Sequence, residues 1–355
     1  MLSSGSTELR PPMDDCVIDF AGGDAELLPA VSLPTDIYNR LAAVDRRSLE
    51  HTFLERYGAV SREPFGPDET VFFLTASLAI DAVARHLAKE GVRRIGVPEP
   101  AFDNLPGLLR EAGLEPVPVP ENDDALLSAV EALDAIFLVL PNNPTGWSPS
   151  QRALAALPAL AKAAGCRVVV DRICRFHQDR QHSKLFLADF DWIDVQETGK
   201  TWSTGGTKLA FVRARSPRTL AALRVESDLH ARAVPPLNLY INAEAIALEG
   251  GDYRVRRAMA LNRSVLEDEL GALGFTVVSR PLGVALVALP RAFPMGSTRL
   301  AQALRAAGIE VVPGRAYFWN SPEAGEAFIR VALIRPCERF AVHAAALAAA
   351  IRGCI

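Results

Sequence analysis

Two hydrophobic patterns alternate along the middle of the chain. Between 77 and 90 apolar residues recur at helical spacing and end before Gly91, whereas 135–140 is apolar throughout, as in a strand covered on both faces. The same criteria predict strands at 92–97, 115–119, 167–170, 192–195 and 208–212, and helices at 105–112 and 150–164. Because strands separated by helices need crossover connections, the pattern predicts a mostly parallel sheet.

The last third of the chain follows a different pattern. A long helical stretch at 237–271 precedes an apolar strand at 284–289, a helix at 297–307 and a strand at 328–334. We therefore expect an α/β protein with a three-layer α/β/α large domain and a smaller α+β domain. The expected division is an N-terminal segment at 1–45 that joins the small domain, the large domain at 46–245 and the small domain at 246–355.

Composition and charge exclude several classes of protein. The chain has 355 residues, 49% of them hydrophobic, which is enough to bury a core that a disordered chain lacks. A net charge of −4 with scattered Lys and Arg argues against a nucleic-acid partner. The longest apolar stretches fall short of the roughly 20 residues of a membrane span, and the first residues lack the apolar stretch of a signal peptide. We expect a cytoplasmic protein without nucleic-acid or membrane partners.

The five cysteines form no CxxC pair and show no histidine spacing typical of metal sites. This pattern predicts a reduced protein with neither a disulfide framework nor a metal site.

Chemically useful residues follow the ends of the predicted strands. Asn143 lies in a PNNPTG loop after one strand, Asp171 directly follows the next, and Lys200 comes after the third. The helix predicted from 77 opens with the small residues Thr75, Ala76 and Ser77. Ligands of open α/β sheets bind at the carboxyl ends of the strands, and helix N-termini present N–H groups to anions.

A carboxylate, a lysine and a phosphate cradle at one sheet edge match the needs of a pyridoxal 5'-phosphate (PLP) enzyme. Lys200 would form a Schiff base with the PLP aldehyde. Asp171 would keep the pyridine nitrogen protonated, so that the ring accepts electrons from the substrate.

From about Phe72 to Arg335 the sequence resembles the class I/II aminotransferases of the fold-type I PLP superfamily, which share the aspartate aminotransferase-like fold. The resemblance implies that Asn143 hydrogen-bonds the ring oxygen, Phe102 stacks on the ring and Lys208 binds the phosphate. It implies that Arg330 binds the α-carboxylate of an L-amino acid substrate. It also implies a homodimer. Two plainer interpretations stay open: Arg330 in a structural ion pair, and Ser77 as a simple helix N-cap.

Two positions depart from the usual family pattern. Cys174 stands where the family has a tyrosine that donates to the ring oxygen, and Glu197 stands where it has a serine that contacts the phosphate. A carboxylate so close to a phosphate must be turned away, protonated or bridged to a cation, for which Lys208 is the candidate.

With these departures the sequence resembles a subgroup of PLP enzymes of specialised metabolism. This subgroup comprises the PLP-dependent arginine oxidases/hydroxylases and the capreomycidine-type cyclases. The stretches that carry the resemblance are 100–104 (PAFDN), 197–202 (ETGKTW), 261–265 (LNRSV) and 329–333 (IRVAL). The resemblance also brings the N-terminal segment to the substrate site through Asp24. It implies reaction at the Cα of an L-amino acid, arginine or a derivative, through an external aldimine and a quinonoid, followed by oxidation, elimination or cyclisation in a biosynthetic pathway.

Three alternatives remain at this point. An ordinary amino acid/2-oxo acid aminotransferase needs only Asn143, Asp171, Lys200 and Arg330. A non-catalytic regulator of the same fold usually carries an N-terminal DNA-binding domain, for which the residues before 77 leave little room. A nicotinamide-dependent dehydrogenase is disfavoured because no GxGxxG motif follows a strand.

Overall fold

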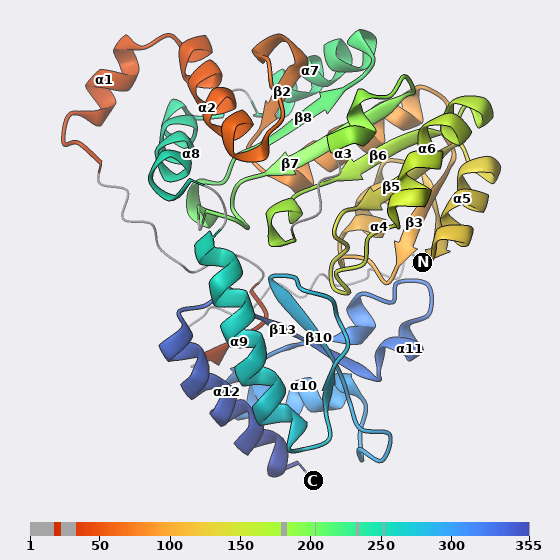
Figure 1. Cartoon of the computed structure of the whole chain (residues 1–355), viewed down its shortest axis with the longest axis vertical. Helices are drawn as coiled ribbons and strands as arrows, with labels where there is room; N and C mark the ends of the chain where they lie inside the picture. Colours follow the sequence, from red (N-terminus) through yellow and green to blue (C-terminus); the bar gives the residue numbers. More distant parts are fainter. Residues whose placement is uncertain are drawn as a thin grey trace, which may run out of the picture.

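A seven-stranded sheet forms the centre of the larger part of the molecule (Figure 1). The structure, a computed structural model, describes residues 18–22, 33–178, 183–202, 204–231, 234–250 and 253–354. The strand order is β2-β8-β7-β6-β5-β3-β4. The strands are β2 (Thr70–Phe73), β3 (Arg94–Glu99), β4 (Glu115–Pro120), β5 (Ala135–Val139), β6 (Arg167–Asp171), β7 (Trp192–Glu197) and β8 (Ala210–Ala214). Because only β8 runs antiparallel to its neighbours, the predicted mostly parallel sheet is confirmed.

Helices cover both faces of this sheet because successive strand residues point to opposite sides. Val169 packs into the apolar cluster under α3, α4 and α7, whereas Val168 and Val170 pack into the cluster under α5 and α6. Helices α2 and α8 cover the sheet beside β2 and β8. The predicted three-layer α/β/α arrangement is therefore confirmed. The helices are α1 (Ile37–Ala43), α2 (Arg46–Ser61), α3 (Ala76–Lys89), α4 (Leu105–Glu111), α5 (Asp123–Ala132), α6 (Gln151–Ala164), α7 (Pro217–Ala231) and α8 (Pro236–Glu249).

The smaller part of the molecule is built on a four-stranded antiparallel sheet of order β12-β13-β10-β9 (Figure 1). Its helices pack against the sheet in one apolar core. A short strand β1 pairs in parallel with β11 and brings the N-terminal residues to this core. The elements are β1 (Ile18–Asp19), α9 (Tyr253–Gly271), β9 (Thr276–Val277), β10 (Val284–Ala288), α10 (Ser297–Ala306), β11 (Ile309–Glu310), β12 (Val312–Pro313), α11 (Pro322–Gly325), β13 (Phe328–Ala332) and α12 (Cys337–Arg352).

The single helical stretch predicted at 237–271 is wrong. The structure divides it into α8 and α9, because α8 ends where Gly250 takes a φ of +65°. Glycine adopts this left-handed conformation without the steric cost of a Cβ, and the helix therefore stops there.

A buried network of charges holds the end of β6. The Arg172 side chain is fully buried and donates to both carboxylate oxygens of Glu63 at 2.7 and 2.9 Å and to both of Asp194 at 2.6 and 2.8 Å. Arg213 also pairs with both acids, and Arg175 pairs with Glu63. Burial alone would raise the pKa of Asp194, but the charges of Arg172 and Arg213 outweigh it and lower that pKa. Each of the two buried carboxylates is thus paired with at least two arginines.

Arg172→Met should destabilise the protein by about 3–5 kcal/mol, because it leaves buried carboxylates short of a partner. Urea denaturation of the purified variant measures the free energy of unfolding. Arg218→Met is the matched control, because Arg218 pairs with Glu90 while its own side chain is 81% exposed, so it should cost at most about 1 kcal/mol. Equal stability of the two variants would contradict this account.

Candidate active site

A cavity of about 380 Å³ opens at the carboxyl ends of the parallel strands. It gathers residues that lie up to 309 positions apart in sequence. The sequence-predicted residues that line it are Thr75, Ala76, Ser77, Phe102, Asn143, Asp171, Glu197, Lys200, Lys208 and Arg330. Asp24 lies outside the described residues. The structure thus brings every described candidate to one site, although the role of each remains a prediction.

Asp171 is the last residue of β6 and lies almost completely buried in this cavity. One of its oxygens accepts from the backbone N–H of Ile173 at 2.8 Å. Burial raises the pKa of Asp171 to about 7, and the neighbouring charge of Glu197 adds to the rise, while Lys200 opposes it. A cation in the cavity would stabilise the charged form of this buried carboxyl group.

The loop that carries Asn143 is fixed by its neighbour. The buried side chain of Asn142 donates to the carbonyl of Pro100 at 2.7 Å and to Glu121 at 2.6 Å, which joins the loops after β3 and β5. Asn143 itself faces the cavity, and its buried Oδ1 has no hydrogen-bond partner among the described residues. Its amide therefore has unused hydrogen-bonding capacity at the site.

The N-terminus of α3 already holds an anion, the Glu197 carboxylate. Thr75 is the N-cap and accepts from the backbone N–H of Leu78 at 3.3 Å, so the interpretation of Ser77 as N-cap is wrong. The backbone N–H of Ala76 donates to Glu197 Oε2 at 2.9 Å. Glu197 is thus not turned away from the predicted phosphate cradle, since its charge stabilises the same helix end that a phosphate would use.

Lys208 lies beside this carboxylate. A Cβ added at Gly199 would lie 3.2 Å from Lys208 Cβ and 3.3 Å from Glu197 Oε1. Both side chains therefore crowd the same glycine in the turn before Lys200. The positions of the two residues are compatible with the predicted bridge between Glu197 and a phosphate.

Arg330 comes from the smaller sheet and enters the cavity from β13. It is buried and donates through Nη2 to the carbonyl of Ala21, while its Nε has no hydrogen-bond partner among the described residues. The structural ion pair considered from the sequence does not form within that part of the chain. An N–H of a buried guanidinium is thus left for an incoming carboxylate.

Cys174 also lines the cavity as a neutral thiol, because burial raises its pKa to about 12. Sequence reasoning did not single out Ala21, Ile80, Asp103, Asn104, Val139 or Ile173, which complete the lining. The contact between Ala21 and Arg330 spans 309 positions, and no local pattern indicates it.

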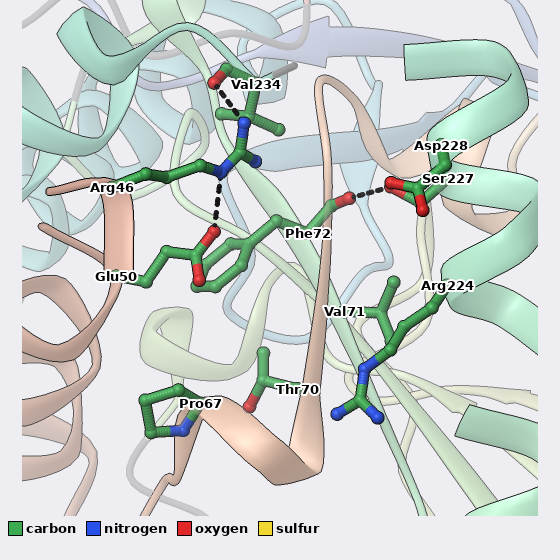
Figure 2. Close-up of a pocket in the computed structure, with 10 residues that line it drawn as sticks. All are labelled: Arg46, Glu50, Pro67, Thr70, Val71, Phe72, Arg224, Ser227, Asp228 and Val234. Carbon is green, nitrogen blue, oxygen red and sulfur yellow. Dashed lines mark hydrogen bonds and ion pairs between the residues drawn. The ribbon is translucent and has the colours of Figure 1, made fainter. Parts of the chain in front are cut away.

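A second cavity of about 250 Å³ lies between α2, β2 and α7 (Figure 2). Its polar groups bind one another: Arg46 donates to Glu50 at 2.8 Å and to the carbonyl of Val234 at 3.4 Å, and Ser227 donates to the carbonyl of Phe72 at 2.7 Å. The side chains of Arg46 and Ser227 thus make structural contacts within this cavity.

Residues 38–336 match the sequence profile of the family described as aminotransferase class I and II. The chain belongs to this family. This aminotransferase-family chain is 30% identical over 303 residues to a probable N-succinyldiaminopimelate aminotransferase DapC of Mycobacterium tuberculosis, covering 76% of this chain and 72% of that protein. It is 25% identical over 278 residues to a probable N-acetyl-LL-diaminopimelate aminotransferase of Bacillus subtilis, covering 74% and 68%.

Solved structures share the fold of this aminotransferase-family member. A structure of MppP soaked with the product 2-ketoarginine superposes with a TM-score of 0.81, at 23% identity, and covers 94% of this chain and 99% of that one. A mutant aspartate aminotransferase of Thermus thermophilus gives a TM-score of 0.76 at 18% identity, with 96% and 97% covered. These superpositions confirm the aspartate aminotransferase-like, fold-type I architecture. The family match confirms a PLP-dependent, aminotransferase-like enzyme.

The cavity of this family member fits PLP. The buried carboxyl of Asp171 suits a protonated ring nitrogen, the side-chain amide of Asn143 can offer an N–H to a ring oxygen, and the N-terminus of α3, beside Glu197, suits a phosphate. Within the described residues, no group of three or more His, Cys, Asp or Glu side chains is arranged to hold a metal ion. Nor does any helix in those ranges have the length and apolar character needed to span a bilayer.

Asp171→Asn should stabilise the cofactor-free protein at a pH of about 8. The folded pKa of about 7 exceeds the ordinary 3.8, so wild-type stability falls as the pH rises between these values. The variant keeps an oxygen for the Ile173 N–H without the buried charge, and its advantage should be on the order of 2–4 kcal/mol. Urea denaturation at a pH of about 8 and of about 4 measures it, since the advantage should shrink at the lower pH. A variant no more stable than wild type at the higher pH would refute the desolvation of Asp171.

Proposed function

We propose that this enzyme uses PLP to act at the Cα of an L-amino acid, arginine or a derivative, in a biosynthetic pathway. The observation that carries the proposal is the convergence of Asn143, Asp171, Lys200 and Arg330 on one cavity. When bound there, PLP supplies an electron sink that makes the Cα–H bond of the substrate acidic. The remaining chemistry falls to the side chains of the chain.

Each side chain has a role suited to its surroundings. The Arg330 guanidinium binds the substrate carboxylate through N–H groups that include its unpartnered Nε. Asp171 holds a proton on the ring nitrogen, because a buried carboxylate and a cation stabilise each other. Lys200, released as an amine when the substrate binds, accepts the Cα proton at Nζ. Phe102 packs against the ring, and Asn143 hydrogen-bonds its oxygen.

Two observations favour a cationic substrate. The overall likeness to MppP is the first, because that protein was soaked with 2-ketoarginine as its product. The second is the distribution of acids in the described cavity. Asp171 and Glu197 are committed to the ring and the helix end, whereas Asp103 lies exposed at the rim, where it would attract a guanidinium. Asp24 is proposed as a further acidic contact.

We propose oxidation, elimination or cyclisation after Cα deprotonation, rather than simple amino transfer. The support is chemical: the neutral thiol of Cys174 and the carboxylate of Glu197 replace the phenol and hydroxyl expected in the family. These replacements change the hydrogen bonds and the charge around the ring and the phosphate.

An ordinary aminotransferase is the second candidate, because the curated relatives at 25–30% identity are aminotransferases. A screen of arginine, its hydroxylated forms and neutral amino acids, with and without 2-oxo acids, separates the two. Oxygen uptake and product mass are followed together. Reversible amino exchange without oxygen uptake or a cyclic or eliminated product would reject the first candidate in favour of the second.

The domain boundaries near 45 and 245, a homodimer and a cytoplasmic location stay predictions. The homodimer is typical of the family, and sedimentation of the purified protein would measure its mass directly.

Lys200→Ala should abolish the visible absorbance of the PLP-loaded protein, because the amine that bonds to the PLP aldehyde is removed. Lys184→Ala is the control, since Lys184 is exposed and does not line the cavity. Borohydride reduction followed by peptide mapping locates the modified lysine. A labelled peptide from another lysine in the Lys200→Ala protein would move the assignment elsewhere.

Glu197→Gln should tighten PLP binding by about tenfold, because it removes a negative charge beside the phosphate but keeps an oxygen for the Ala76 N–H. Equilibrium dialysis measures the dissociation constant. Asp103→Asn serves as the control, since it neutralises an acid at the exposed rim of the same cavity and should leave PLP affinity unchanged. Weaker binding by the Gln variant would mean that the carboxylate assists the phosphate through a bridging cation.

A further inference from the structure

The short segment after β6 joins both parts of the molecule to the site. It comprises Phe176 and His177, which end the 3-10 turn Arg175–His177, and the next residue, Gln178. Gln178 donates to the carbonyl of Gly146 at 2.9 Å, in the loop of Asn143, and to that of Pro281 at 2.8 Å, in the loop before β10. The segment therefore touches the large sheet and the smaller sheet at once.

His177 connects the main chain at Lys200 to the loop before β10 in a similar way. The backbone N–H of Gly283 points at His177 Nδ1, with 3.2 Å between the nitrogens, so Nδ1 must be the acceptor. The proton of the neutral ring is then on Nε2, which donates to the carbonyl of Lys200 at 3.2 Å. Burial lowers the pKa of His177 to about 4, and the ring is neutral near pH 7. One imidazole thus bonds the main chain at both Lys200 and Gly283.

The close approach of the imidazole requires glycine at 283. A Cβ there would lie 2.9 Å from His177 Cε1 and 2.6 Å from Ile334 Cδ1, both inside normal contact. Gly283 directly precedes β10, and in that strand Leu286 is the partner of Arg330 on β13. The imidazole therefore links the lysine backbone to the sheet that carries the proposed carboxylate-binding arginine.

We propose that His177 is a positioning residue that fixes the main chain of Lys200 relative to the Arg330-bearing sheet, and so sets the reach of the lysine amine toward the substrate Cα. This inference rests on the proposed roles of Lys200 and Arg330. It extends them, because the two groups that bind and deprotonate the substrate come from different sheets and must keep a fixed separation.

Two substitutions separate the two hydrogen bonds of the ring. His177→Gln can donate from Nε2 to the Lys200 carbonyl, whereas His177→Asn keeps only an acceptor near Nδ1 for Gly283. His177→Ala loses both. His86→Ala is the matched control, because His86 is also buried, hydrogen-bonds Thr219 Oγ1 at 3.1 Å and does not line the cavity.

Two readouts are compared in all variants. The first is turnover of the loaded enzyme, where His177→Asn and His177→Ala should lower kcat by about 10- to 100-fold with a much smaller change in KM. His177→Gln keeps the bond to Lys200 but loses the bond to Gly283, so it breaks the link between the two sheets and should also lower kcat. The second is the rate of reductive methylation of Lys200 in the cofactor-free protein, measured by peptide mass. That rate should change in the Asn and Ala variants and stay at the wild-type value in the Gln and His86→Ala proteins.

The proposal is overturned if the Asn variant matches wild type in both readouts, or if the Gln variant, which lacks the bond to Gly283, keeps the kcat of wild type. If the Ala variant does not fold, the Gln and Asn pair still decides. A wild-type protein that binds no PLP would instead refute the proposed function. The methylation rates would still test whether the hydrogen bond from His177 positions Lys200.

Discussion

The site depends on a carboxyl group that is taken out of water at the end of a strand. Asp171 and Arg172 are consecutive, and alternation along the strand sends Asp171 into the cavity and Arg172 into the buried network with Glu63 and Asp194. The network anchors the strand end from one side of the sheet. Burying the Asp171 carboxylate costs free energy, which a proton or a cation beside it would offset.

The sequence allowed the large sheet and most of the cavity lining to be predicted, for a simple geometric reason. Asn143, Asp171 and Lys200 each follow a strand, and parallel strands bring their carboxyl ends to one edge. Contacts between distant segments could not be predicted in this way. The Arg330–Ala21 contact, the ion pairs of Arg172 and the two bonds of His177 join positions that no periodicity connects. The break at Gly250 was missed although the sequence EGGD at 249–252 interrupts the apolar pattern with two glycines, a helix-stop signal.

The two residues that differ from the usual family pattern, Glu197 and Cys174, both line the cavity. Glu197 puts a negative charge at the helix end of α3, and Cys174 puts a neutral thiol beside Asp171. The framework that holds Asn143, Asp171 and Lys200 is retained, so these changes alter the electrostatics of the site without altering its architecture. Such a division between a retained frame and altered surroundings is how one fold supports several reactions.

The contact between Arg330 and the Ala21 carbonyl has a consequence for the N-terminal strand. The guanidinium that would receive a carboxylate is partly engaged by the main chain two residues after β1, which itself pairs with β11. A carboxylate that arrives at this guanidinium competes with a peptide oxygen of the same chain. Loss of that hydrogen bond would remove one of the contacts that hold the residues after β1 against the smaller sheet.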